Sequence, residues 1–184
     1  MKSMTQLDLG PIYNYAESDL QNPYNDISLV NSSKFVICGF SGIYELAKAL
    51  RKPIFAIDIA DFTEFSRRPG IITETVILLP KVIKAKSSGR VLTIDELDQL
   101  KIMSLDARAF REFITSDKCP VFLESNDPKA ILNTIKLGEK YLTSRKISGD
   151  VAAGKTEYQK LYLFSDFDLA PILSPYWTNL HLKV

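Results

Sequence analysis

The strongest constraint on the fold of this chain is a change of hydrophobic period between positions 34 and 57. Residues 34–38 contain an unbroken apolar run, which is typical of a strand buried on both faces of a parallel sheet. After Ser41 the apolar residues follow helical spacing, at Ile43, Leu46, Ala47 and Leu50. Pro53 then opens a second apolar run at 54–57. The order of strand, helix and strand predicts a βαβ unit.

The same alternation returns later in the chain. Thr93 and Glu96 have the spacing of a capping box, and Asp127 before Pro128 predicts a second helix start. The predicted strands are 76–79, which Pro80 stops, and 121–123. The predicted helices are 27–30 with Asn25 and Asp26 as its cap, one from Thr93 through Leu97 and Leu100, 107–114, and a last one with Ile131, Ile135, Gly138 and Leu142 on one face. This pattern favours the α/β class, as a Rossmann-like parallel sheet with helices on both faces.

A length of 184 residues suits one domain, so we expect a single Rossmann-like domain over 1–184. Within it, 1–24 is an irregular entry segment and 143–184 is a tail that packs on the core or on a partner. Residues 58–72 form a long polar connection of the kind that often carries function.

Composition excludes several classes of protein. The 23 basic and 22 acidic side chains leave a net charge of +1, so nothing favours nucleic acid as a partner. No window approaches the ~20 apolar residues of a membrane span, and the N-terminus has no signal-peptide core, so we expect a cytoplasmic protein. Cys38 and Cys119 predict no disulfide framework. The one histidine, His181, predicts a packing or surface residue and excludes histidine-rich metal sites.

The loop that follows the first predicted strand has the ingredients of a phosphate site. Gly39 and Gly42 let backbone amides approach an anion, Ser41 offers a hydroxyl or a helix cap, and the helix that follows points its positive end at the same place. In open parallel sheets the ligand crevice lies beyond the carboxyl ends of the strands. The alternative is a tight turn that needs glycine only for its backbone angles.

A resemblance adds to these observations. The stretch 33–42 (SKFVICGFSG), followed by 47–54 (AKALRKPI), resembles the donor-binding C-terminal domain of GT-B-type glycosyltransferases. Further matching pieces are 25–29, 79–81, 88–93 and 127–132, and together they look like a family of bacterial glycosyltransferases. The resemblance covers about residues 13–142.

The resemblance implies a nucleotide-sugar donor as ligand, with no separate cofactor and no metal. The residues that it places on the donor are Gly39, Phe40, Ser41, Gly42, Ile43, Glu45 and Lys81. The amides and the Ser41 hydroxyl would hold the diphosphate, Glu45 a ribose or sugar hydroxyl, and Lys81 part of the diphosphate charge. From the residues alone, a solvated lysine after a strand is the favoured explanation of Lys81, and Glu45 is equally open to being a solvent-facing helix residue.

A GT-B enzyme works between two Rossmann-like domains, and this chain has room for one. We therefore expect the donor-binding half of a glycosyltransferase that needs a second domain or partner for transfer. The alternative is a nucleotide-sugar-binding module without catalysis. No residue is assigned as catalytic, and the aromatic residues of the tail suggest an interface with a partner or a second copy.

Two further motifs are weaker. Residues 149–156 (GDVAAGKT) fit the P-loop pattern, but no buried strand precedes them, so a P-loop protein is the less favoured alternative. Asp166 and Asp168 have the spacing of a D-x-D metal motif, but a surface turn is the strongly favoured explanation, because the motif lies too close to the end for an acceptor domain to follow.

Overall fold

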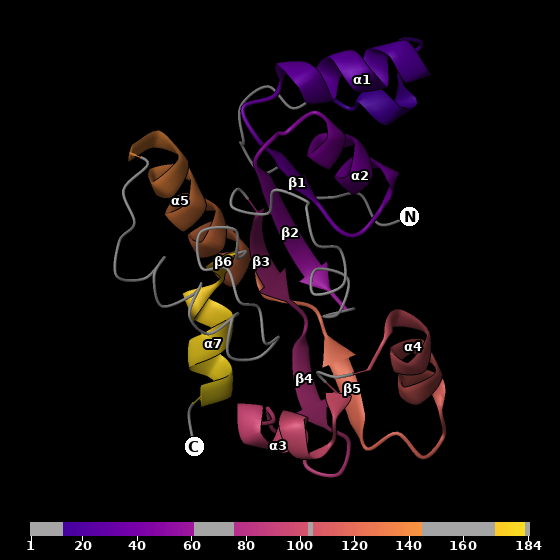
Figure 1. Ribbon diagram of the computed structural model, residues 1–184, viewed down its shortest axis with the longest axis vertical. Coiled ribbons are helices and arrows are strands. Elements are labelled where there is room, and N and C mark those ends of the chain that lie inside the picture. Colours follow the sequence, from indigo (N-terminus) through magenta and orange to yellow (C-terminus); the bar gives the residue numbers. More distant parts are fainter. Residues whose placement is uncertain (1–12, 61–75, 103–104, 145–171, 183–184) are drawn as a thin grey trace.

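The computed structural model describes residues 13–60, 76–102, 105–144 and 172–182 (Figure 1). The helices are a 3₁₀ turn at Tyr15–Glu17, α1 (Pro23–Ser32), α2 (Gly42–Ala49), α3 (Ile94–Gln99), α4 (Ala107–Thr115), α5 (Pro128–Ser144) and α7 (Pro175–Leu182). The strands are β1 (Val36–Cys38), β2 (Ile54–Ile59), β3 (Val76–Pro80), β4 (Val82–Ala85), β5 (Val121–Glu124) and β6 (Ile172–Leu173). The protein is thus of mixed α/β structure.

A parallel sheet with the order β1-β2-β3-β6 forms the centre of the fold. Ile54 of β2 pairs with Val36 on one side and with Val76 on the other, and the two residues of β6 pair with Ile77 and Leu78. The βαβ unit predicted around α2 is confirmed. The described strands follow chain order across the sheet, without a reversal.

Helices cover both faces of this sheet, as the sequence predicts. Phe55 and Ile77 point to one face, where Ile135 and Tyr141 of α5 pack against them. Their neighbours along the strands belong to the main core, which also contains Tyr44 and Ala47 of α2. Both faces are therefore buried, which explains why β2 and β3 read as unbroken apolar runs.

Helix α5 comes unusually close to the sheet at Gly138. A side chain at this position would overlap Ile77 Cδ1 and Phe55 Cε1, and it would lie 2.6 Å from Phe55 Cζ. Glycine thus sets the distance between the helix and the two strands. The predicted helix start is also confirmed, because the Asp127 carboxylate accepts a hydrogen bond from the Ala130 amide at 2.8 Å.

The N-terminal end of α1 differs from the prediction. Asn22 caps the helix by accepting hydrogen bonds from the amides of Tyr24 and Asn25, each at 3.0 Å. Asn25 and Asp26, the predicted cap, lie inside the first turn. Proline favours the first helical position, so Pro23 explains why the helix starts earlier.

The strand at 121–124 also differs from the expected parallel arrangement. β5 pairs antiparallel with β4, with Val82 opposite Glu124 and Ala85 opposite Val121. β4 begins one residue after β3 ends, with only Lys81 between them. This second sheet carries α3 and α4 and extends from the carboxyl end of β3, below the parallel sheet in Figure 1.

The cap of α3 confirms the predicted capping box. The Thr93 hydroxyl accepts a hydrogen bond from the Glu96 amide, and the Glu96 carboxylate accepts one from the Thr93 amide at 2.9 Å. Arg90 also pairs with Glu96 and fixes its carboxylate from outside. Because Arg90 and the Thr93 amide both donate to it, the pKa of Glu96 falls to about 2.

The C-terminal helix α7 packs back on the protein. Trp177 is buried, and its indole N–H donates to the Lys81 carbonyl at 3.0 Å. His181 is also buried and donates from Nδ1 to the Leu92 carbonyl at 2.6 Å. Its ring stacks on Trp177 with the centroids 4.2 Å apart. His181 is thus a packing residue, one of the two roles expected for it.

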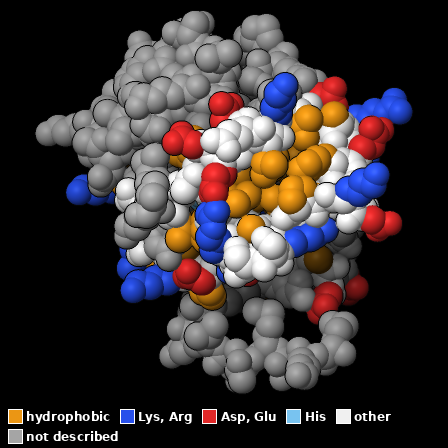
Figure 2. Space-filling view, turned by 90° about the horizontal axis from the view of Figure 1, so that it is seen from below, with side chains coloured by type: hydrophobic (Ala, Val, Ile, Leu, Met, Phe, Trp, Pro, Cys, Tyr) orange, Lys and Arg blue, Asp and Glu red, His pale blue; other side chains and the backbone are white. Residues whose placement is uncertain are grey.

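The face seen from below carries apolar side chains at its centre, with charged side chains around them (Figure 2). Leu100, at the end of α3, and Phe122, on β5, are exposed apolar side chains of the lower sheet and its helices. Among the described helices, none has the length and apolar character needed to cross a membrane.

Candidate functional site

The carboxyl ends of β1, β2 and β3 lie side by side at one edge of the parallel sheet (Figure 1). Gly39 follows β1, and a Cβ atom there would lie 3.9 Å from the Ile57 carbonyl oxygen of β2. Lys81 follows β3, and its amide donates to the Ile59 carbonyl at 2.9 Å. The 39–42 loop and Lys81 therefore flank the end of β2, about two strand spacings of ~4.8 Å apart.

The 39–42 loop does not need glycine for its backbone angles. Among the described glycines only Gly89 has a positive φ angle. A Cβ atom at Gly42 would have nothing within 4 Å, so the space beside it is open. The explanation that these glycines serve a tight turn is therefore not supported at Gly42.

Ser41 occupies the N-cap position of α2, but its side chain makes no capping hydrogen bond. The amides of Gly42 and Ile43 open the helix and have no acceptor one turn earlier within it. Gly42 and Ile43 are both exposed. Together these groups offer a hydroxyl and two N–H donors at the positive end of a helix.

The side chains around this loop are engaged in packing and pairing. Phe40 meets Tyr44 edge to face, with ring centroids 5.0 Å apart, and so anchors the loop to the core. The Glu45 carboxylate pairs with Lys48 at 3.2 Å along the helix. Phe40 thus holds the loop in place.

Lys81 is held from three sides. In addition to its backbone bonds to Ile59 and Trp177, its ammonium donates to the Ser125 hydroxyl at 2.9 Å. Among the described residues, no carboxylate lies within ion-pair distance of this ammonium. Its charge is therefore not offset by a neighbour in the described part of the chain.

Asp58 and Asn126 join β2 to the loop that follows β5. One oxygen of Asp58 accepts from the Asn126 backbone amide at 2.8 Å and from its side-chain amide at 2.7 Å. Asp58 does this with φ at +54°, in the left-handed region that few residues other than glycine adopt. Aspartate adopts this region more readily than most residues, and the two hydrogen bonds hold Asp58 there.

The orientation of the Asn126 side chain follows from its partners. Its nitrogen donates to both Asp58 and the Pro80 carbonyl, so its oxygen must point away from them. That oxygen is buried and has no partner among the described residues. Beside Asn126 lies a hollow of about 250 Å³ that reaches Ser125, Asp127 and Leu180.

Two groups that often act as nucleophile or base are unsuited to that role here. Burial raises the pKa of the Cys38 thiol to about 11, so it stays protonated at neutral pH. Burial lowers the pKa of His181 to about 4, although its bond to the Leu92 carbonyl acts the other way. Within the described ranges, no cluster of His, Cys, Asp and Glu is arranged to hold a metal ion.

The structure thus brings the predicted residues Gly39, Ser41, Gly42 and Ile43 to the same sheet edge as Lys81. From the sequence no role is predicted for Asn126 or Ser125, and Asp58 is placed only at the start of the polar connection 58–72. An acidic residue at the end of an apolar strand and a polar loop before Pro128 were the available signs. Most of the polar connection 58–72, the P-loop pattern at 149–156, and Asp166 and Asp168 lie outside the described residues.

Comparison with known proteins adds no family. The chain matches no protein-family model, and the searches of curated proteins and of solved structures returned no match. The likeness to a GT-B donor domain therefore stays a prediction.

Proposed function

We propose that this chain binds a nucleotide sugar, with the diphosphate over the N-terminal end of α2, as the donor-binding half of a glycosyltransferase. The observation that carries the proposal is the open space beside Gly42, together with the hydrogen-bond donors there that do not serve the helix. The Ser41 hydroxyl does not cap its own helix, and no atom lies within 4 Å of a Cβ built on Gly42. An anion at this position would receive the donors that the helix leaves unsatisfied.

Lys81 supports the same ligand from the other side of β2. Its ammonium is held by a neutral hydroxyl, and its backbone is fixed by β2 and α7. A cation placed in this way can offset the charge of a diphosphate that extends from α2 toward β3. The Glu45 carboxylate can accept a hydrogen bond from a sugar or ribose hydroxyl only if its ion pair with Lys48 is broken.

Catalysis by the chain alone is not part of the proposal. A transferase needs a base near its acceptor. Burial keeps the Cys38 thiol protonated and the His181 ring neutral and weakly basic at neutral pH, so neither side chain is suited to that role. We infer that a partner domain supplies this base. A nucleotide-sugar-binding module without catalysis is the second candidate function. A donor-binding half would transfer sugar once its partner is added, whereas a binding module would not.

The experiment is a calorimetric titration of the full chain with UDP, GDP, UDP-glucose and GDP-mannose. Gly42→Val fills the open space, and we expect it to abolish binding without unfolding the protein. Ser41→Ala loses one hydrogen bond to a charged ligand, so we expect about tenfold weaker binding or more. Ala49→Val is the matched control, because Ala49 is exposed at the other end of the same helix.

Three results would change the conclusion. Unchanged affinity in Gly42→Val and Ser41→Ala would overturn the site. Binding that is lost in Lys155→Ala but kept in Gly42→Val would favour the P-loop alternative. Sugar transfer or donor hydrolysis by the isolated chain would contradict the need for a partner.

A further inference from the structure

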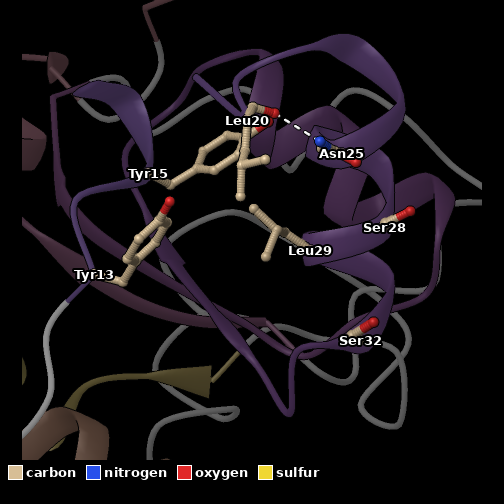
Figure 3. Close-up of a pocket in the computed structure, with 7 residues that line it drawn as sticks. All are labelled: Tyr13, Tyr15, Leu20, Asn25, Ser28, Leu29 and Ser32. Carbon is tan, nitrogen blue, oxygen red and sulfur yellow. Dashed lines mark hydrogen bonds between the residues drawn. The ribbon is translucent and has the colours of Figure 1, made fainter. Parts of the chain in front are cut away.

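A second pocket lies between α1 and the segment that precedes it (Figure 3). Its volume is about 350 Å³, which is within the usual range for small-molecule sites. Tyr13, Tyr15, Leu20 and Leu29 form its apolar walls. Figure 3 shows these four side chains gathered around the hollow.

The polar part of the lining comes from one face of α1. Asn25, Ser28 and Ser32 also line the pocket, and with Leu29 they follow the helical spacing of three and four residues. No charged residue lines it among those described. The chemistry is therefore apolar and aromatic, with neutral hydrogen-bonding groups beside it.

Hydrogen bonds hold the walls of the pocket in place. The Tyr15 hydroxyl donates to the Asp26 carboxylate at 2.7 Å and accepts from the Asn22 amide at 3.1 Å, which fixes the ring. The Asn25 side-chain nitrogen donates to the Leu20 carbonyl at 2.7 Å, so its oxygen is left for another partner. A rigid wall lowers the cost of binding, because less side-chain entropy is lost.

The apolar walls are also exposed to water. The exposed fraction is 65% for Tyr13, 56% for Leu20 and 49% for Leu29. Contiguous exposed apolar side chains around a hollow are typical of a binding site. Since this pocket shares no residue with the 39–42 loop or with Lys81, it is a site of its own.

We propose that this pocket binds a small uncharged molecule with one aromatic ring and one hydrogen-bonding substituent. The ring lies between Tyr15 and the two leucines, where burial of its faces supplies the affinity. The substituent meets the Asn25 oxygen or a serine hydroxyl. A charged ring compound is disfavoured, because the described part of the lining offers no opposite charge to offset its desolvation.

The test is a titration of the ¹⁵N-labelled full chain, followed by NMR, with indole, benzyl alcohol and benzoate. We expect indole and benzyl alcohol to shift the amide signals of Asn25, Ser28 and Leu29, with Kd on the order of 1 mM. Benzoate, which differs from benzyl alcohol in its charge, should bind about tenfold more weakly.

Leu29→Arg places a charge in the pocket from a half-exposed position, so the fold should tolerate it, and we expect at least about tenfold weaker binding of indole. Tyr24→Arg is the matched control, because Tyr24 lies on the same helix, is 84% exposed and does not line the pocket. The affinity of the Tyr24→Arg variant for indole should equal that of the unmodified chain. Equal binding of indole by both variants, amide shifts confined to residues that do not line the pocket, or preference for benzoate would each overturn the proposal. None of these results bears on the nucleotide-sugar site.

Discussion

Gly138 offers the sharpest test of how α5 packs on the parallel sheet. In an isolated helix, Gly138→Ala would be stabilising by about 1 kcal/mol, because alanine has the higher helix propensity. In this protein the added methyl group overlaps Ile77 and Phe55, both buried on neighbouring strands. The contact with Phe55 Cζ alone, at 2.6 Å, is well inside van der Waals distance.

The magnitude follows from these two opposing effects. Overpacking of a core costs about 1–3 kcal/mol, and here two side chains on paired strands must move together, which favours the upper end. After the gain in helix propensity, we expect a net loss of about 2 kcal/mol in the free energy of unfolding. For a chain of 184 residues this lowers Tm by roughly 4–8 °C.

The assay is urea or thermal unfolding followed by circular dichroism. Gly42→Ala is the control, since a methyl group there meets no atom within 4 Å, and its stability should change by less than about 0.5 kcal/mol. Phe55→Leu removes two of the overlapping atoms, so Gly138→Ala should cost about 1 kcal/mol less in that background. A gain in stability from Gly138→Ala in the unmodified chain would refute the close approach of α5.

Two further predictions concern the polar groups of the interior. Burial lowers the pKa of His181 from 6.5 to about 4, so the unfolded chain takes up the proton at a higher pH than the folded protein does. The contribution of the neutral ring to the free energy of unfolding is therefore complete above pH 6.5. It falls by up to ~3 kcal/mol as the pH drops to 4. Unfolding in urea across this range should show the loss, and His181→Gln should remove most of the pH dependence; an equal slope in both proteins would contradict the assignment. Asp58→Ala should destabilise the protein by about 2–4 kcal/mol, because it leaves the Asn126 amides without their acceptor and places alanine at a positive φ. Asp58→Asn keeps an acceptor oxygen and should cost about 1 kcal/mol or less. Equal unfolding midpoints for these two variants would show that the carboxylate oxygen is not the anchor.

The sequence predicts the parts of the fold that are specified locally. The βαβ unit around α2 and the capping box at Thr93 are confirmed, because hydrophobic period and cap chemistry act within a few residues. The cap of α1 is misplaced by a few residues because Asn22 and Asn25 are chemically equivalent candidates, and only the backbone distinguishes them.

The antiparallel pairing of β4 with β5 is the part of the fold that the sequence does not predict. β4 and β5 are separated by two helices, and nothing in the residues 121–124 indicates that their partner is antiparallel. The same limit applies to the candidate site. Gly39 to Ile43 are recognisable as a contiguous motif, whereas Asp58 and Asn126 are 68 positions apart in the sequence and meet only through the fold.

The bond from Trp177 to the Lys81 carbonyl has a consequence for the order in which the protein matures during synthesis. The partners are 96 positions apart, so the ribosome has made both sheets and α5 before the residue that supports Lys81 exists. Until α7 has emerged and docked, the Lys81 carbonyl lacks its hydrogen bond from the Trp177 indole. A ribosome-bound chain that stops before α7 should therefore fold its βαβ unit but acquire the complete sheet edge last.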